Sequence, residues 1–122
     1  VSVDGGMFDN PRYALYEAKY EALLAARMND KKTETVTVAG KCCESGDMLV
    51  VDAVLPAAES GDLLAVLTTG AYNYSMASNY NRNAIPPVVL VNDGKAAYIV
   101  KPQTYEDMMS RDELAPWLEK EN

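Results

Sequence analysis

The sequence predicts a mainly β domain, a barrel or sandwich with short helices at its periphery. About five or six short segments are rich in β-branched and apolar residues, and several alternate in polarity, which is the period of a half-buried strand. Turn-forming residues separate them at short spacing, as in all-β folds. With 122 residues, the chain is long enough for one domain with its own core and too short for two ordinary ones.

The predicted strands follow one another with short connections. The clearest strand carries the letters TETVTVAGK, and a hairpin is expected where Asn92, Asp93 and Gly94 separate two strand-like segments. The strands are expected at 33–41, 47–56, 63–68, 88–91 and 95–101. The N-terminal letters VSVDGG also read as a strand that runs into a glycine turn.

Two further segments favour helix or loop. Residues 71–81 follow Gly70 and have the composition of a short helix or loop, and residues 104–122 have helical character. Thr104 with Asp107 forms a plausible N-cap and third-position acid. The letters ESGD occur twice, at 44–47 and 59–62, each time before an apolar segment, so both are expected to be turns that enter a strand.

Residues 19–28 fit two structures. Their Ala, Glu, Leu and Lys content favours a helix by propensity, whereas alternation at Tyr20, Ala22, Leu24 and Ala26 also suits a strand. The residues alone leave the two alternatives open.

Charge and composition exclude several classes of function. The formal net charge of −7 argues against a nucleic-acid binder or a protein that docks on an anionic membrane. No apolar segment reaches the ~20 residues of a membrane span, and the N-terminus has no signal-peptide pattern. Since the chain has no histidine, Ser-His-Asp and Cys-His catalysis are excluded within it. A zinc site is not expected either, because neither a second Cys pair nor a histidine is present to complete four ligands.

The only two cysteines, Cys42 and Cys43, are adjacent in the letters GKCCESGD. Neighbouring cysteines rarely form a disulfide, so we expect free thiols and a cytoplasmic protein. If the strand continued through them, the two side chains would point to opposite faces, one packed and the other exposed. On this evidence alone, two structural thiols remain the simpler interpretation, and a reactive Cys43 is the alternative.

Three other residues could contact an anionic ligand. Arg12 lies four residues before Tyr16, and a guanidinium with a phenol could hold a carboxylate. Tyr72 follows Gly70 and Ala71, whose small size allows close approach of a ligand to the backbone. The simpler alternatives are a surface Arg beside a core Tyr, and a Tyr packed over the end of a barrel.

Together these motifs resemble a known family. The letters VDGGM, DNPR with a following ALY, GKCCESGD and GAYNYSMASNYN resemble the C-terminal domain of bacterial diaminopimelate decarboxylases, which belong to the alanine-racemase-like, pyridoxal-phosphate-dependent decarboxylases. The resemblance covers nearly the whole chain and is weakest after about residue 85. Two departures are Tyr13, where the family often has Pro, and the stretch NRNAIPPVVLV, where it is usually rich in Arg and Pro.

The resemblance implies an alanine-racemase C-terminal-domain-like β fold and a strand, not a long helix, over roughly 19–28. It also implies roles for individual residues. Cys43 matches the proton donor to the carbon that loses its carboxylate, and Glu44 matches the acid that recognises the distal amino group of the substrate. Arg12 and Tyr16 match the clamp on the distal carboxylate, and Tyr72 matches a tyrosine that contacts substrate and cofactor. Ser45 and Asp47 are expected to shape the turn, and Tyr80 and Asn81 receive no chemical role.

The implied reaction is decarboxylation of meso-2,6-diaminopimelate to L-lysine. The implied cofactor is pyridoxal 5′-phosphate, which the family holds through a lysine of an N-terminal (β/α) barrel domain. Neither that barrel nor a match to that lysine occurs in this sequence, so residues 1–122 are expected to be one domain of a longer enzyme and inactive alone. The resemblance also implies a homodimer, with Cys43 and Glu44 supplied across the subunit interface. The rival hypotheses are a related decarboxylase of ornithine, arginine or carboxynorspermidine, and a stand-alone β module that binds a partner without a cofactor.

Overall fold

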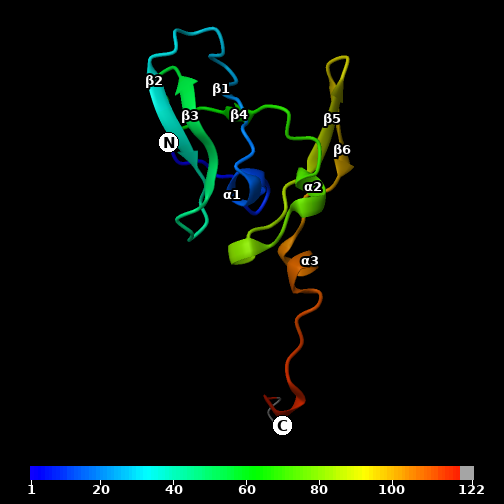
Figure 1. The fold of residues 1–122 in the computed structure, drawn as a ribbon. Helices are drawn as coiled ribbons and strands as arrows, with labels where there is room; N and C mark the ends of the chain where they lie inside the picture. The colour runs from blue at the N-terminus through cyan, green and yellow to red at the C-terminus, as the bar shows by residue number, and fades with distance from the viewer. Residues whose placement is uncertain (119–122) are drawn as a thin grey trace. The chain divides into compact units, whose positions relative to one another are not determined.

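The structure is a computed structural model that describes residues 1–118 (Figure 1). The chain divides into two compact units, Val1–Ile85 and Pro86–Asn122. The first unit contains α1 (Arg12–Tyr16), β1 (Ala22–Leu24), β2 (Glu34–Ala39), β3 (Met48–Leu55), β4 (Leu64–Val66), α2 (Asn73–Met76) and the 3-10 helix η1 (Tyr80–Arg82). The second contains β5 (Val88–Asn92), β6 (Lys95–Val100), α3 (Tyr105–Met109) and the 3-10 helix η2 (Pro116–Leu118).

The strands pair as three antiparallel ladders, β1 with β4, β2 with β3, and β5 with β6. The prediction of a mainly β chain with short helices is therefore confirmed. Within residues 1–118 the ladders have two strands each and do not close into a barrel, because closure requires every strand to have a neighbour on both sides. A parallel bridge from Ser2 to Ala39 adds the N-terminal segment to the edge of β2.

The core of the first unit lies on β2 and β3. Val38 and Leu55 are fully buried, and Ala53 alternates along β3 with the exposed Asp52 and Val54. This alternation is the expected signature of a strand that buries one face. The cluster of buried apolar side chains comprises Ala22, Val38, Leu49, Val50, Ala53 and Leu55.

The segment 19–28 is extended, as the resemblance implied, but its strand is shorter than predicted. Only β1 is a strand, with Ala22 and Leu24 buried and Leu23 half-buried. The chain then turns, because the Arg27 N–H donates to the Leu24 carbonyl and the Arg27 guanidinium pairs with Asp30 and Asp62. Tertiary pairing with β4 thus overrides the helical propensity of this stretch.

The predicted hairpin and helix cap are both confirmed in the second unit. Asp93 and Gly94 have φ values of 48° and 72°, the left-handed pair that a tight two-residue hairpin requires. Thr104 caps α3, since its side chain accepts from the Asp107 N–H while the Asp107 carboxylate accepts from the Thr104 N–H. The end of the predicted helical stretch, 119–122, lies outside the described residues. Among those that are described, no helix has the length and apolar character needed to cross a bilayer.

Candidate active-site surface

Arg12 begins a short helix that presents two of the predicted site residues. Pro11 precedes α1, and Glu17 ends it in the left-handed conformation with φ 53°, where its N–H donates to the Tyr13 and Arg12 carbonyls. One turn of helix brings residues four apart onto the same face. The Arg12 guanidinium accordingly lies 5.5 Å from the centroid of the Tyr16 ring, which is 63% exposed.

Tyr72 reaches the same guanidinium from a strained turn before α2. The Arg12 guanidinium lies 4.7 Å from the centroid of the Tyr72 ring, within the range of a cation–π contact. Tyr72 has φ 72° and ψ −37°, and the Asn73 N–H donates to the Ala71 carbonyl at 3.0 Å, which closes a three-residue γ-turn of the rare, strained type. Strained residues of this kind concentrate at functional sites.

The turn is supported by Asn73, which is almost completely buried. Its side-chain amide donates to the Thr69 carbonyl at 2.9 Å and so ties the two ends of the turn together. Tyr72 as a whole residue remains 64% exposed. The geometry therefore holds the backbone of Tyr72 firmly while its phenol faces solvent.

Cys43 and Glu44 lie in the turn between β2 and β3, which agrees with the turn expected at 44–47. β2 ends at Ala39, so strand alternation does not separate Cys42 from Cys43. Instead the chain bends, with the Glu44 N–H donating to the Cys42 carbonyl and the Asp47 N–H to the Glu44 carbonyl. The carboxylate of Glu44 accepts from the Gly46 N–H at 3.0 Å and remains exposed.

Asp47 is the buried anchor of this turn, which agrees with its predicted structural role. Its carboxylate accepts from the Met7 N–H at 2.6 Å and the Cys42 N–H at 2.7 Å, and only 3% of the residue is exposed. A side chain at Gly40 would overlap this carboxylate, which explains why a glycine stands there. The second ESGD turn repeats the main-chain bond, from the Asp62 N–H to the Glu59 carbonyl, and enters β4 as expected.

The two thiols differ in exposure. Cys42 is half-buried and Cys43 is exposed, and both are free. Burial, reinforced by the Asp47 carboxylate, raises the pKa of the Cys42 thiol above its ordinary value. Cys42 therefore ionises less readily than an ordinary cysteine. The two thiols differ because of how the turn places them, not because of strand alternation.

The predicted site residues thus form two groups on the first unit. Arg12, Tyr16 and Tyr72 make one cluster of ring contacts, and Cys43 and Glu44 share one turn. Among residues 1–118 the structure records no hydrogen bond or ring contact between the two groups. All of these side chains are at least partly open to solvent, so the candidate site is a surface rather than an enclosed cavity.

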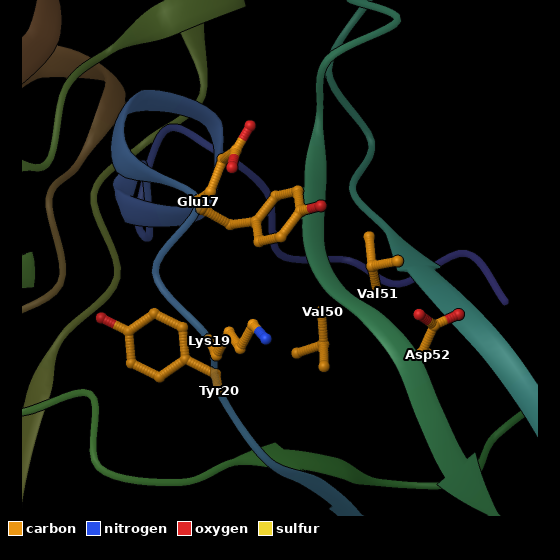
Figure 2. Close-up of a pocket in the computed structure, with 7 residues that line it drawn as sticks. Glu17, Lys19, Tyr20, Val50, Val51 and Asp52 are labelled. Atoms are coloured by element: carbon orange, nitrogen blue, oxygen red, sulfur yellow. The ribbon is translucent and has the colours of Figure 1, made fainter.

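A pocket of about 320 Å³ lies nearby, between α1 and β3 (Figure 2). Carboxylates from Glu17 and Asp52, the Lys19 ammonium and the Tyr20 ring lie around it, with Val50 and Val51 on the β3 side. None of the predicted site residues lines this pocket.

Sequence reasoning missed two residues that contact the cysteines. The side-chain oxygen of Asn81 accepts from the Cys43 N–H at 2.7 Å, and the Asn83 amide approaches the Cys42 sulfur at 3.7 Å. The available signal was the asparagine-rich stretch SNYNRN, since asparagine is enriched in left-handed backbone and bonds readily to main-chain groups.

Comparison with known proteins decides the family. Residues 1–70 match the family described as pyridoxal-dependent decarboxylase, C-terminal sheet domain. The chain belongs to this family. The resemblance seen in the sequence motifs is therefore confirmed, and the mainly β architecture agrees with a sheet domain of these decarboxylases.

Curated members of the decarboxylase family are similar over most of the chain. The diaminopimelate decarboxylase of Synechocystis sp. is 61% identical over 112 residues, and that of Bacillus subtilis is 59% identical over the same length. Each alignment covers 92% of this chain but only 24% and 26% of the relative. The chain thus spans about a quarter of the length of these relatives.

Solved structures give the same picture of this decarboxylase domain. Diaminopimelate decarboxylase from M. jannaschii superposes with a TM-score of 0.88 at 37% identity, over 97% of this chain and 27% of that one. The Helicobacter pylori enzyme complexed with L-lysine superposes with a TM-score of 0.81 at 36% identity, over 90% of this chain and 27% of that one. The roles of Arg12, Tyr16, Cys43, Glu44 and Tyr72 remain predictions.

Proposed function

We propose that this chain forms the C-terminal sheet domain of a diaminopimelate decarboxylase, which converts meso-2,6-diaminopimelate to L-lysine and CO2. The observation that carries the proposal is the identity of 45–61% with curated enzymes of that name, over about nine-tenths of the chain. The free thiols fit a cytoplasmic enzyme.

The cofactor of the proposed enzyme is pyridoxal 5′-phosphate, which acts as an electron sink for the carbon that loses its carboxylate. Two residues of this chain are suited to contact the edge of this cofactor. Tyr72 offers an exposed phenol on a strained, well-supported turn, and the neighbouring Arg12 guanidinium adds positive charge for anionic groups. We assign Tyr72 to contact with cofactor and substrate, and the lysine that binds the cofactor to the N-terminal barrel domain.

Cys43 is the proposed proton donor. A positioned cysteine thiol can hold a proton and release it to a substrate carbon within reach. The exposure of Cys43 in its turn supports this role, because the sulfur is open to a bound substrate. Cys42, half-buried and held beside Asp47, is assigned to packing.

Glu44, Arg12 and Tyr16 are proposed to select the long dicarboxylate substrate. The Glu44 carboxylate can pair with the distal ammonium group once both are desolvated. The Arg12 guanidinium can bind the distal carboxylate through two parallel hydrogen bonds, and the Tyr16 hydroxyl lies on the same helical face. Ornithine and arginine lack that second carboxylate.

We further propose that the active enzyme is a homodimer in which each site is shared between subunits. Two observations support this. Among the described residues, Cys43 and Glu44 make no hydrogen bond or ring contact with the cluster of Arg12, Tyr16 and Tyr72. Both groups are also at least partly exposed, as expected for surfaces that a second subunit and a barrel domain would cover.

A chimeric enzyme tests the proposal. The matching quarter of the Bacillus subtilis diaminopimelate decarboxylase is replaced by residues 1–122, and growth of a lysine auxotroph and lysine formation by the purified chimera are measured. We expect growth without lysine. Cys43→Ala should lower kcat by roughly 10²–10⁴, the contribution of a positioned acid.

Cys42→Ala is the matched control, because it removes the neighbouring thiol from the same turn. It should leave kcat within about threefold of the parent chimera if Cys42 only packs. A folded chimera that turns over ornithine or arginine and not diaminopimelate would reject the substrate assignment. Equal losses in both cysteine variants would reject the assignment of Cys43 as the donor.

A further inference from the structure

The stretch 80–83 contacts the turn that carries the two cysteines. The Asn81 side-chain oxygen accepts a hydrogen bond from the Cys43 N–H at 2.7 Å. Asn81 itself adopts the left-handed conformation, with φ 53° and ψ 26°, in the middle of η1. A residue in this conformation cannot continue the helix, and its side chain here leaves η1 to reach the cysteine turn.

The turn that presents Asn81 is braced by its own asparagines. The Asn83 side-chain amide donates to the Tyr80 carbonyl at 3.0 Å, and the Asn79 amide donates to the Asn83 carbonyl at 2.9 Å. The Asn83 amide also approaches the Cys42 sulfur at 3.7 Å. Since Asn81 of η1 and Asn83 at its end contact Cys43 and Cys42, the position of this stretch and that of the cysteine turn are coupled.

Two consecutive main-chain amides are thereby held by different parts of the unit. The Cys42 N–H donates to the buried Asp47 carboxylate, and the Cys43 N–H donates to Asn81. Asp47 belongs to the same turn, whereas Asn81 lies 38 residues further along the chain. Asp47 therefore shapes the turn, and Asn81 fixes where that turn sits against the rest of the unit.

We infer that Asn81 is a positioning residue for Cys43, holding the peptide group that carries the proton-donor thiol at the place where the donor is needed. The inference rests on the proposed role of Cys43. A displacement of about 1 Å at a reacting group can lower a rate by roughly 10²-fold, so an anchor on the donor's own amide has a direct effect on the reaction. The raised pKa of the half-buried Cys42 agrees with a turn in which only Cys43 is offered to a substrate.

Asn81→Gly removes the acceptor but keeps a residue that tolerates a positive φ, so the backbone of η1 is not strained. In the chimeric enzyme we expect residue-resolved hydrogen–deuterium exchange of the Cys43 amide to accelerate at least about tenfold. The Cys42 amide, which Asp47 holds, should keep its protection. We expect kcat to fall about tenfold or more, with KM changed less than about twofold.

Asn81→Asp is the conservative variant, because it keeps an oxygen acceptor at the same position. Protection of the Cys43 amide should return. The rate should return with it, because the acceptor again holds the peptide group of Cys43. A kcat that stayed low although the Cys43 amide regained its protection would show that Asn81 does not act through this bond.

Thr68→Gly is the matched control, since Thr68 is exposed and also has a positive φ, 59°. It should change neither exchange at Cys43 nor kcat. The inference is overturned if the Cys43 amide keeps its protection in Asn81→Gly, or if that protection is lost while kcat stays at the parent value. Failure of the proposed function looks different: the chimera is inactive before any substitution, while the exchange experiment still reports on the Asn81 contact.

Discussion

The Arg12 guanidinium lies 4.7 Å from the centroid of the Tyr72 ring, which joins α1 to the strained turn before α2. The Tyr16 ring lies 5.5 Å from the same guanidinium. The Arg12 guanidinium thus contacts two exposed tyrosine rings, which come from separate parts of the first unit. Because the guanidinium contacts the rings and not the hydroxyl groups, a Tyr→Phe substitution removes the hydroxyl and keeps the ring contact.

Tyr72→Phe removes the hydroxyl and keeps the ring over Arg12. We expect the free energy of unfolding of the chain to change by less than about 0.5 kcal/mol, since the ring contact with Arg12 and the turn both remain. Loss of a hydrogen bond to a charged ligand group is worth about 1.5–3 kcal/mol, so kcat/KM of the chimera should fall roughly 10- to 100-fold. Tyr74→Phe, at another exposed tyrosine in α2, is the control, and an equal loss there would contradict a specific role for Tyr72.

Glu44→Gln separates the charge of this side chain from its part in the turn. The amide oxygen can still accept from the Gly46 N–H, so the stability of the chain should not change measurably. The loss of negative charge should weaken binding of the substrate's ammonium group and raise KM for diaminopimelate about tenfold or more. The measurement is steady-state kinetics of the chimera.

The second ESGD turn offers the control for that experiment. Glu59 begins the same four letters, and its carbonyl accepts the same main-chain bond from Asp62. Glu59→Gln should leave KM unchanged. A KM in Glu44→Gln equal to that of the parent would reject the assignment of Glu44 to substrate recognition.

Gly40→Ala tests the buried Asp47 anchor. A methyl group at Gly40 would overlap the Asp47 carboxylate, which has little freedom to move because it binds the Met7 and Cys42 N–H groups. We expect a loss of about 2 kcal/mol or more in the free energy of unfolding, measured by urea titration of the chain. Gly70→Ala, where a methyl group meets open space, should change stability by less than about 0.5 kcal/mol. Equal effects at the two glycines would contradict the packing at Asp47.

Asp9→Asn tests a pH dependence of stability. Burial raises the pKa of the Asp9 carboxyl above its ordinary 3.8, with a further contribution from the nearby Asp47 charge, although the Gly6 N–H partly opposes the shift. The folded chain therefore binds this proton more tightly than the unfolded chain, and stability falls as pH rises from 3.8 through the raised folded value.

Asp9→Asn removes this titration and keeps the side-chain oxygen that accepts from the Gly6 N–H. The variant should be more stable than the parent near pH ~7, and the difference should disappear below the unfolded pKa. Urea midpoints at several pH values measure it, with the exposed Asp4→Asn as control. A variant less stable than the parent at neutral pH would show that the carboxylate is net stabilising there.

Local patterns predicted the parts of the fold that depend on neighbours in the chain. The β5–β6 hairpin follows from an Asp-Gly turn, and the cap of α3 follows from Thr104 and Asp107, because each requires residues at most a few positions apart. Strand lengths were less predictable. β1 ends at Leu24, four residues before the predicted end, since the ion pairs of Arg27 favour a turn there.

The sequence by itself determined the family and the identity of the candidate chemical groups, because those depend on residue types and spacing. The tertiary structure alone decided how the groups are held: Arg12 against Tyr72, Cys42 beside the buried Asp47, and the Cys43 amide on Asn81. The physical reason is that these contacts join residues far apart in the chain or depend on burial. No local propensity encodes such contacts, and they form only when the packing of the unit brings the segments together.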